Sequence, residues 1–143
     1  MKDIAADLKR TSKIPAAESP DGAVVFSFKY VDYSNKRFGL AIHENRENYT
    51  DILLDRLKAV CGLTLKEFTQ PLNSKSLRSH IIRFEDTSEP DGFPILSEIW
   101  KERPWQFELT QAEYGRIHGF LMGCIFYVVW FDPKHKLYSK DKN

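Results

Sequence analysis

Hydrophobic positions in the second half of the chain follow the two-residue period of β-strands. Residues 105–110 alternate strictly between apolar and polar side chains, which is typical of a half-buried strand. Residues 115–121 and 124–132 form two further β-rich runs, and the dipeptide Met122-Gly123 between them predicts a tight hairpin turn. The second run is apolar from Cys124 to Phe131, so we expect it to be a central strand.

The first half of the chain predicts one strand followed by two helices. The alternation from Ala23 to Tyr33 is typical of a strand. A stripe of apolar residues at helical spacing then predicts a helix that is closed by Gly62; its members are Tyr49, Leu53, Leu57 and Val60. Thr64 and Glu67 have the spacing of a capping box, which predicts a second, shorter helix that Pro71 ends.

Two shorter elements complete the pattern. Residues 80–85 predict a strand, and a third helix is expected between Pro94 and Pro104. This order predicts an α+β fold, with helices packed on one face of a mostly antiparallel sheet. We expect a polar N-terminal extension at residues 1–22, a single domain at 23–138 and a basic tail at 139–143.

Composition narrows the class of protein. The chain has 143 residues, of which 42% are hydrophobic and 13% aromatic, which suffices for the core of a single soluble domain. A net charge of +1 excludes a strongly basic surface over the whole domain. The longest apolar run is too short to cross a membrane, and the charged N-terminus is unlike a signal peptide. Cys61 and Cys124 lie in apolar runs, so we expect reduced, buried thiols in a cytoplasmic protein.

The expected turn at Met122-Gly123 fixes which side chains share each face of the hairpin. Leu121 would pair with Cys124, and His118 with Tyr127, and directly paired residues point to the same side. The helix-free face is then expected to carry Arg116, His118, Phe120, Tyr127, Val129 and Phe131, and the helix-packed face Ile117, Leu121, Cys124, Phe126, Val128 and Trp130.

The polar side chains of the helix-free face suit chemistry on a phosphodiester. Arg116 can bind phosphate oxygens in a bidentate manner, and His118 titrates near neutral pH and can exchange protons. Glu108, from the alternating strand, adds a carboxylate as a further catalytic candidate. Arg83 and Tyr127 are candidates for binding nucleic acid. The arginine can bind phosphate oxygens, and an exposed aromatic ring can stack on an unpaired base.

A basic segment follows the last strand. His135 lies between Lys134 and Lys136, with Tyr138 close behind. In the functional interpretation, His135 or Tyr138 acts as an acid or base at the rim of the site, and the two lysines bind nucleic acid. In the alternative interpretation, this segment is a solvated turn whose Leu137 and Tyr138 attach the terminus to the core.

Structural alternatives exist for the sheet face as well. An Arg and a Glu on adjacent strands commonly form an ordinary cross-strand charge pair. A register slip of one residue would also move Arg116 and His118 into the core. The four histidines have no metal-ligand spacing, so neither a metal nor another cofactor is expected.

The element order resembles that of the RelE/YoeB/ParE group of small bacterial toxins. The similar stretch runs from Tyr114 through Gly115-Arg116-Ile117-His118-Gly119 and the last strand to His135-Lys136-Leu137-Tyr138. The resemblance implies mRNA cleavage without a metal, by side chains on the exposed sheet face, and an antitoxin-like protein as partner. By position, it implies roles for Arg116, His118, His135 and Tyr138.

The resulting hypothesis is a metal-independent endoribonuclease or RNA-binding protein of bacterial toxin type. The catalytic candidates are Arg116, His118, Glu108, His135 and Tyr138. One alternative is a non-enzymatic protein-interaction module, such as one encoded by a mobile element, because exposed aromatics are as typical of protein interfaces as of RNA sites. Another is a domain that binds a small ligand.

Overall fold

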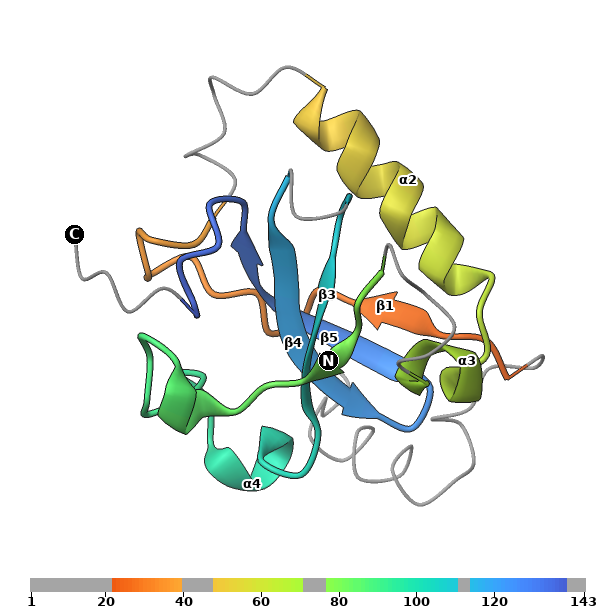
Figure 1. Cartoon of the computed structure of the whole chain (residues 1–143). Helices are drawn as coiled ribbons and strands as arrows, with labels where there is room; N and C mark the ends of the chain where they lie inside the picture. The colour runs from red at the N-terminus through yellow and green to blue at the C-terminus, as the bar shows by residue number, and fades with distance from the viewer. Residues whose placement is uncertain (1–21, 40–47, 71–76, 111–113, 139–143) are drawn as a thin grey trace, which may run out of the picture.

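A five-stranded sheet organises the chain. The computed structural model describes residues 22–39, 48–70, 77–110 and 114–138, so the predicted N-terminal extension before Gly22 and the predicted tail lie outside the described residues. The strands are β1 (Val25–Ser27), β2 (His80–Ile81), β3 (Pro104–Glu108), β4 (Arg116–Met122) and β5 (Ile125–Asp132). They lie in the order β1-β5-β4-β3-β2 (Figure 1).

The α+β class is confirmed, but the sheet is mixed and not mostly antiparallel as predicted. β2, β3, β4 and β5 pair in antiparallel fashion, whereas β1 runs parallel to β5. Periodicity identifies strands but carries no signal for which distant strand becomes a neighbour. The strand β1 pairs with β5, the last strand in sequence, and this pairing makes β1 a parallel strand.

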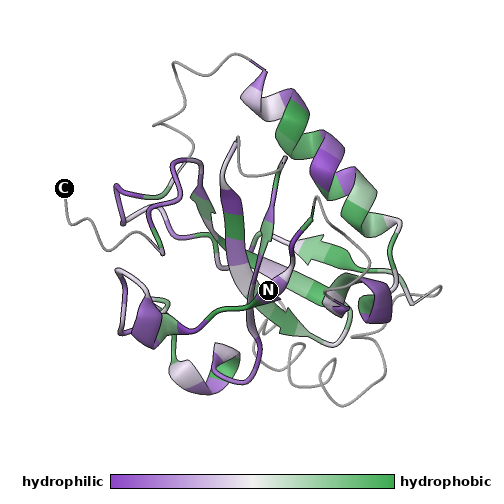
Figure 2. Ribbon diagram, viewed as in Figure 1, coloured by the Kyte–Doolittle hydropathy of each residue, from purple (hydrophilic) through white to green (hydrophobic). Residues whose placement is uncertain are grey.

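Two helices cover one face of the sheet. The predicted helices are confirmed as α2 (Tyr49–Cys61) and α3 (Leu65–Thr69), and α3 begins with the predicted capping box of Thr64 and Glu67. Figure 2 shows apolar and polar residues alternating along α2, as expected for a helix that buries one side. The first hydrophobic core lies between these helices and the sheet, with helix residues Leu53, Leu57, Val60 and Phe68 against strand residues Phe107, Ile117, Phe126 and Val128.

The other face of the sheet is covered as well. The short helices η4 (Phe84–Asp86) and α4 (Ser97–Trp100) flank this face, and Figure 1 shows α4 on the opposite side of the sheet from α2. A second hydrophobic core fills the space below them, made of Phe38, Ile82, Phe84, Phe93, Phe120, Tyr127, Val129, Trp130 and Leu137. The prediction that all helices pack on one face is therefore wrong. The predicted strand at 80–85 and the third helix are both shorter than expected, because much of this region forms the irregular cover.

The hairpin of β4 and β5 turns one residue later than predicted. Met122 pairs with Ile125, so the loop residues are Gly123 and Cys124. Gly123 has a φ of 60°. A two-residue hairpin turn of this kind requires a positive φ at its first loop position, which glycine adopts readily.

A bulge then changes the end of β5. The register shifts between His118 and Gly119, so that Gly119 pairs with Val128 whereas His118 pairs with Trp130. This extra residue reverses the predicted faces of the last positions: Trp130 belongs to the second core and Phe131 to the first. The predicted faces of Ile117, Leu121, Phe126 and Val128 are confirmed.

The two cysteines differ in environment. Cys124 is buried as predicted, whereas Cys61 is exposed, so that half of the prediction is wrong. Cys61 follows Val60, the last residue of the buried stripe. Because a helix rotates by about 100° per residue, the Cys61 side chain points away from that stripe. Within the described residues, no helix has the length and apolar character needed to cross a membrane.

Gly119 allows the two central strands to approach at the bulge. A β-carbon at Gly119 would lie 2.0 Å from the carbonyl oxygen of Tyr127 and 2.6 Å from the ring of Phe126. We predict that Gly119→Ala lowers the free energy of unfolding by about 3 kcal/mol, measured by urea denaturation, because the backbone of β5 must move.

Gly62→Ala is the matched control. A β-carbon there would meet only the carbonyl oxygen of Ala59 at 3.3 Å, and the φ of −84° suits any residue. Equal stability of the two variants would show that the bulge tolerates a side chain.

Candidate functional site

The helix-free face was predicted to be open to solvent, and this prediction is wrong. His118 is 0% exposed, and Gln106 and Glu108 on the neighbouring strand are also buried. Tyr127, predicted to stack on bases, instead stacks on Phe120 with ring centroids 5.0 Å apart. The aromatic cover described above comes from segments that are distant in sequence, so strand periodicity could not reveal it.

One end of this face is nevertheless polar. His80, Gln106 and His118 are successive partners across β2, β3 and β4. In the next row, Glu108 pairs with Arg116, and Arg116 with Asp132 on β5. Directly paired residues share a face, so the register brings these side chains together.

Asp132 is the most heavily hydrogen-bonded carboxylate of the group. Its Oδ2 accepts hydrogen bonds from His118 Nε2 at 2.9 Å and from the backbone amide of Leu137 at 2.9 Å, and its Oδ1 accepts one from the amide of Lys136 at 2.7 Å. Burial alone would raise the pKa of Asp132, but the hydrogen bonds outweigh burial and hold the pKa below its ordinary value. Asp132 is therefore an ionised anchor for the chain that follows β5.

His118 is neutral in this environment. Burial lowers its pKa, and the charges of Arg116 and His80 act in the same direction, against the opposing effect of Asp132. A neutral imidazole that donates from Nε2 to Asp132 has an unprotonated Nδ1, and this atom is buried with no hydrogen-bond partner among the described residues. His118 therefore orients Asp132 and does not face solvent.

Arg116 connects a buried carboxylate to the basic segment. Its Nη2 lies 2.9 Å from Glu108 Oε1, and its Nη1 lies 2.7 Å from His135 Nδ1. Because a guanidinium only donates hydrogen bonds, His135 Nδ1 is the acceptor in this contact. The Glu108 side chain is 1% exposed and that of Arg116 is 21% exposed, so Glu108 pairs with Arg116 on the buried side of the guanidinium.

Four residues surround a pocket of about 210 Å³ next to Arg116. They are Arg116, Asp132, His135 and Tyr138, and we refer to this cavity as the Arg116 pocket. The hydroxyl oxygen of Tyr138 accepts a hydrogen bond from the backbone amide of Arg83 at 2.9 Å, and burial raises the pKa of this phenol. The phenol of Tyr138 is therefore protonated at neutral pH.

The pocket contains three of the five predicted catalytic residues. Arg116, His135 and Tyr138 line it, whereas Glu108 and His118 lie buried beside it and contact Arg116 and Asp132. Asp132 was not among the predicted catalytic residues. The sequence signal that could have identified Asp132 is its position at the end of the apolar strand, directly before Pro133 and the basic segment.

The predicted nucleic-acid-binding residues are more scattered. Arg83 is exposed and forms ion pairs with Glu85 at 3.4 Å and Asp86 at 3.5 Å. Lys134 is exposed and Lys136 is half-buried, both next to His135. Across the ranges that the structure describes, no group of three or more histidine, cysteine and acidic side chains is arranged to hold a metal ion.

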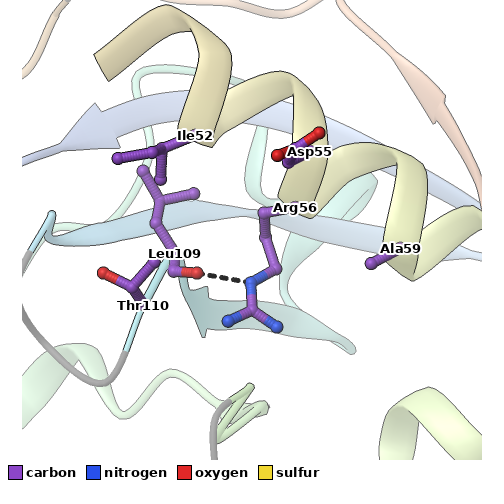
Figure 3. Close-up of a pocket in the computed structure, with 6 residues that line it drawn as sticks. All are labelled: Ile52, Asp55, Arg56, Ala59, Leu109 and Thr110. Atoms are coloured by element: carbon purple, nitrogen blue, oxygen red, sulfur yellow. Dashed lines mark hydrogen bonds between the residues drawn. The ribbon is translucent and has the colours of Figure 1, made fainter. Parts of the chain in front are cut away.

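A second pocket, of about 190 Å³, lies between α2 and the end of β3 (Figure 3). Arg56 reaches from the helix and donates from Nε to the carbonyl oxygen of Leu109 at 2.5 Å. The guanidinium thereby satisfies a backbone acceptor where β3 ends, which explains Arg56 as a structural residue.

Comparison with models of protein families, with curated proteins and with solved structures finds no match for this chain. The function is therefore argued from the Arg116 pocket itself.

The His118–Asp132 hydrogen bond can be tested with two amide substitutions. Glutamine can place a donor near the position of Nε2, whereas asparagine reaches only the position of Nδ1. We predict that His118→Asn lowers the free energy of unfolding by about 2 to 3 kcal/mol and that His118→Gln costs less than half as much. Urea denaturation measures both, and amide exchange at Lys136 and Leu137 should accelerate only in His118→Asn. If both substitutions lower the free energy of unfolding equally, the hydrogen bond to Asp132 is not the source of the stability that His118 contributes.

The same pair predicts a pH dependence of stability. The lowered pKa of His118 means that the unfolded chain takes up a proton below about pH 6.5, whereas the folded protein does not until a lower pH. The stability contributed by neutral His118 is therefore present above pH 6.5 and is lost as the pH falls towards the lowered pKa. Thermal unfolding between pH 7.5 and 5 should show a steeper loss in the wild type than in His118→Gln. Parallel curves would contradict the assignment.

Proposed function

We propose that this chain binds RNA and cleaves it without a metal at the Arg116 pocket. The observation that carries the proposal is the convergence of a guanidinium, an imidazole and a phenol on one pocket, from Arg116, His135 and Tyr138. These three groups can bind a phosphate, accept a proton and donate a proton, as the cleavage of a ribose phosphodiester requires.

Arg116 binds the scissile phosphate in this proposal. Glu108 fixes the guanidinium through Nη2, so that Nη1 points towards the pocket and His135. A phosphate oxygen competes with the neutral imidazole for this donor, and a charge-assisted hydrogen bond to an anion is the stronger of the two. Substrate binding therefore releases the Nδ1 of His135.

His135 and Tyr138 move the protons. The released Nδ1 accepts the proton of the ribose 2′-hydroxyl, whose oxygen attacks the phosphorus atom. Tyr138, which is protonated at neutral pH as a phenol ordinarily is, donates to the departing 5′-oxygen. The products are a 2′,3′-cyclic phosphate and a free 5′-hydroxyl. Glu108 and His118, which are buried, position Arg116 and Asp132 in this proposal.

A role of bacterial toxin type, with an antitoxin-like partner, belongs to the same proposal. Its support is the element order of a strand, two helices and a terminal antiparallel hairpin, which resembles that of the RelE/YoeB/ParE group. A neighbouring gene for a small protein that binds this chain and blocks RNA cleavage would support the role.

The decisive experiment is incubation with RNA in the presence of EDTA. We predict that the wild type yields fragments ending in 2′,3′-cyclic phosphate and does not cleave RNA that is 2′-O-methylated. Arg116→Ala should lower the rate by at least about 100-fold and His135→Ala by about 100-fold, as typical for loss of a charge-stabilising or acid–base group. Tyr138→Phe should reduce the rate while leaving RNA affinity unchanged.

Arg103→Ala is the control for Arg116→Ala. Arg103 is also half-buried, but its guanidinium lies over the ring of Trp105, away from the residues that line the pocket. Equal activity of the Arg116→Ala and Arg103→Ala proteins would contradict the proposal.

A second candidate function is protein binding through the loop after β1. Phe28 and Tyr33 on this loop are 52% and 86% exposed, an arrangement found at protein interfaces. If RNA is neither bound nor cleaved, this loop is the next feature to test, by comparing the self-association of the wild type with that of Phe28→Ser.

A further inference from the structure

Arg78 is a second arginine directed at Glu108, and the sequence did not indicate it. Its Nη1 lies 3.7 Å from the same Glu108 Oε1 that Arg116 contacts at 2.9 Å. Unlike Arg116, its side chain is 63% exposed. Two guanidinium groups, one exposed and one at the pocket, therefore meet over one buried carboxylate.

The backbone at Arg78 is held in an unusual conformation. Its φ is 45°, in the left-handed region that favours glycine and asparagine and costs other residues roughly 1 kcal/mol or more. Residues on both sides are fixed: the carbonyl of Leu77 accepts the amide of Glu108 at 2.8 Å, and the hydroxyl of the buried Ser79 donates to the carbonyl of Phe68. The flanking contacts thus enforce the strained conformation that presents the guanidinium beside Glu108.

The contact with Glu108 does not by itself account for an arginine at this position. At 3.7 Å the contact lies beyond hydrogen-bonding distance, and an ion pair with so exposed a partner adds little to stability. Glu108 already has a closer partner in Arg116.

The guanidinium groups at this place are more exposed than the carboxylates that accompany them. Glu108 carries one negative charge against the two positive charges of Arg78 and Arg116. The nearby carboxylate of Asp132 is occupied by His118 and by two backbone amides. Glu108 and Asp132 balance the two guanidinium charges in number, but both carboxylates are 1% exposed, whereas the side chains of Arg78 and Arg116 are 63% and 21% exposed. The charges that a ligand meets beside the Arg116 pocket are therefore those of the guanidinium groups.

We propose that Arg78 and Arg116 together hold one phosphate group of the RNA, with Arg78 as a binding residue on the outer side. This inference rests on the proposed function for the source of the phosphate. Nitrogen atoms at 3.7 and 2.9 Å from one carboxylate oxygen are close enough for separate oxygens of a single phosphate to reach both guanidiniums. We call this pair of arginines the clamp. His80 follows Arg78 by two residues, and its ring lies 6.0 Å from that of Tyr138, which lines the pocket.

The test compares Arg78→Asn with Arg103→Asn. Asparagine tolerates the left-handed conformation, so the protein should fold with unchanged or greater stability while the guanidinium is lost. Arg103 is the control because its guanidinium lies over the ring of Trp105 and is not part of the pocket lining. The probes are inorganic phosphate, followed by NMR of the arginine side-chain N–H groups, and a short single-stranded RNA without a cleavable 2′-hydroxyl.

We expect Arg78→Asn to bind inorganic phosphate about tenfold more weakly, as for the loss of one charged hydrogen bond, with Arg103→Asn unchanged. For RNA, the plot of log affinity against log salt concentration should lose about 0.7 of slope, the value for one phosphate contact on a single strand. Unchanged phosphate affinity in Arg78→Asn, or no phosphate binding by the wild type at tens of millimolar, would overturn the clamp.

The clamp and the proposed function can fail separately. If Arg78→Asn weakens phosphate binding but the wild type binds no RNA, the clamp stands for a phosphate from another source and the ribonuclease proposal is lost. If RNA is cleaved at the pocket and Arg78→Asn affects neither ligand, the ribonuclease stands and the clamp is lost.

Discussion

The buried carboxylate of Asp132 joins the end of the sheet to residues 133–138, and the candidate site depends on that connection. It accepts hydrogen bonds from the imidazole of His118 on β4 and from the amides of Lys136 and Leu137 in the chain that follows. A buried carboxylate must be compensated in this way, because an unpaired charge in the interior costs several kcal/mol. The turn that satisfies it also places His135 and Tyr138 beside Arg116.

The same segment is fixed from its other side. The amide of Ser88 donates to the carbonyl of Leu137 at 2.7 Å, and the guanidinium of Arg37 donates to the carbonyl of Lys136 at 3.1 Å. Leu137 is fully buried in the second core. His135 and Tyr138 are thus carried on a well-packed backbone, which is the condition for holding acid and base groups at a defined separation.

Charge in the site is arranged around a second buried carboxylate, Glu108. It fixes Arg116 at 2.9 Å and faces Arg78 at 3.7 Å. An ordinary cross-strand charge pair, which the sequence allowed as the structural alternative, is therefore present between Glu108 and Arg116. The pair and the functional proposal are compatible, because a guanidinium held on one edge by a carboxylate still presents its other edge to a ligand.

The sequence by itself determined the elements with strong local signals. The stripe from Tyr49 to Val60 produced α2, the Thr64–Glu67 capping box produced the start of α3, and strict alternation produced β3. It also identified Arg116 as a candidate from the hairpin register, and His135 and Tyr138 from the basic segment that follows the last strand.

Only the tertiary structure decided which of these groups reach solvent. The aromatic cover over the second face buried His118 and Tyr127, and the bulge beside Gly119 exchanged the faces of Trp130 and Phe131. The parallel pairing of β1 with β5 and the approach of Arg78 to Glu108 also join residues far apart in sequence. Periodicity reports which side of an element is apolar, but the partner that covers that side is chosen by long-range packing.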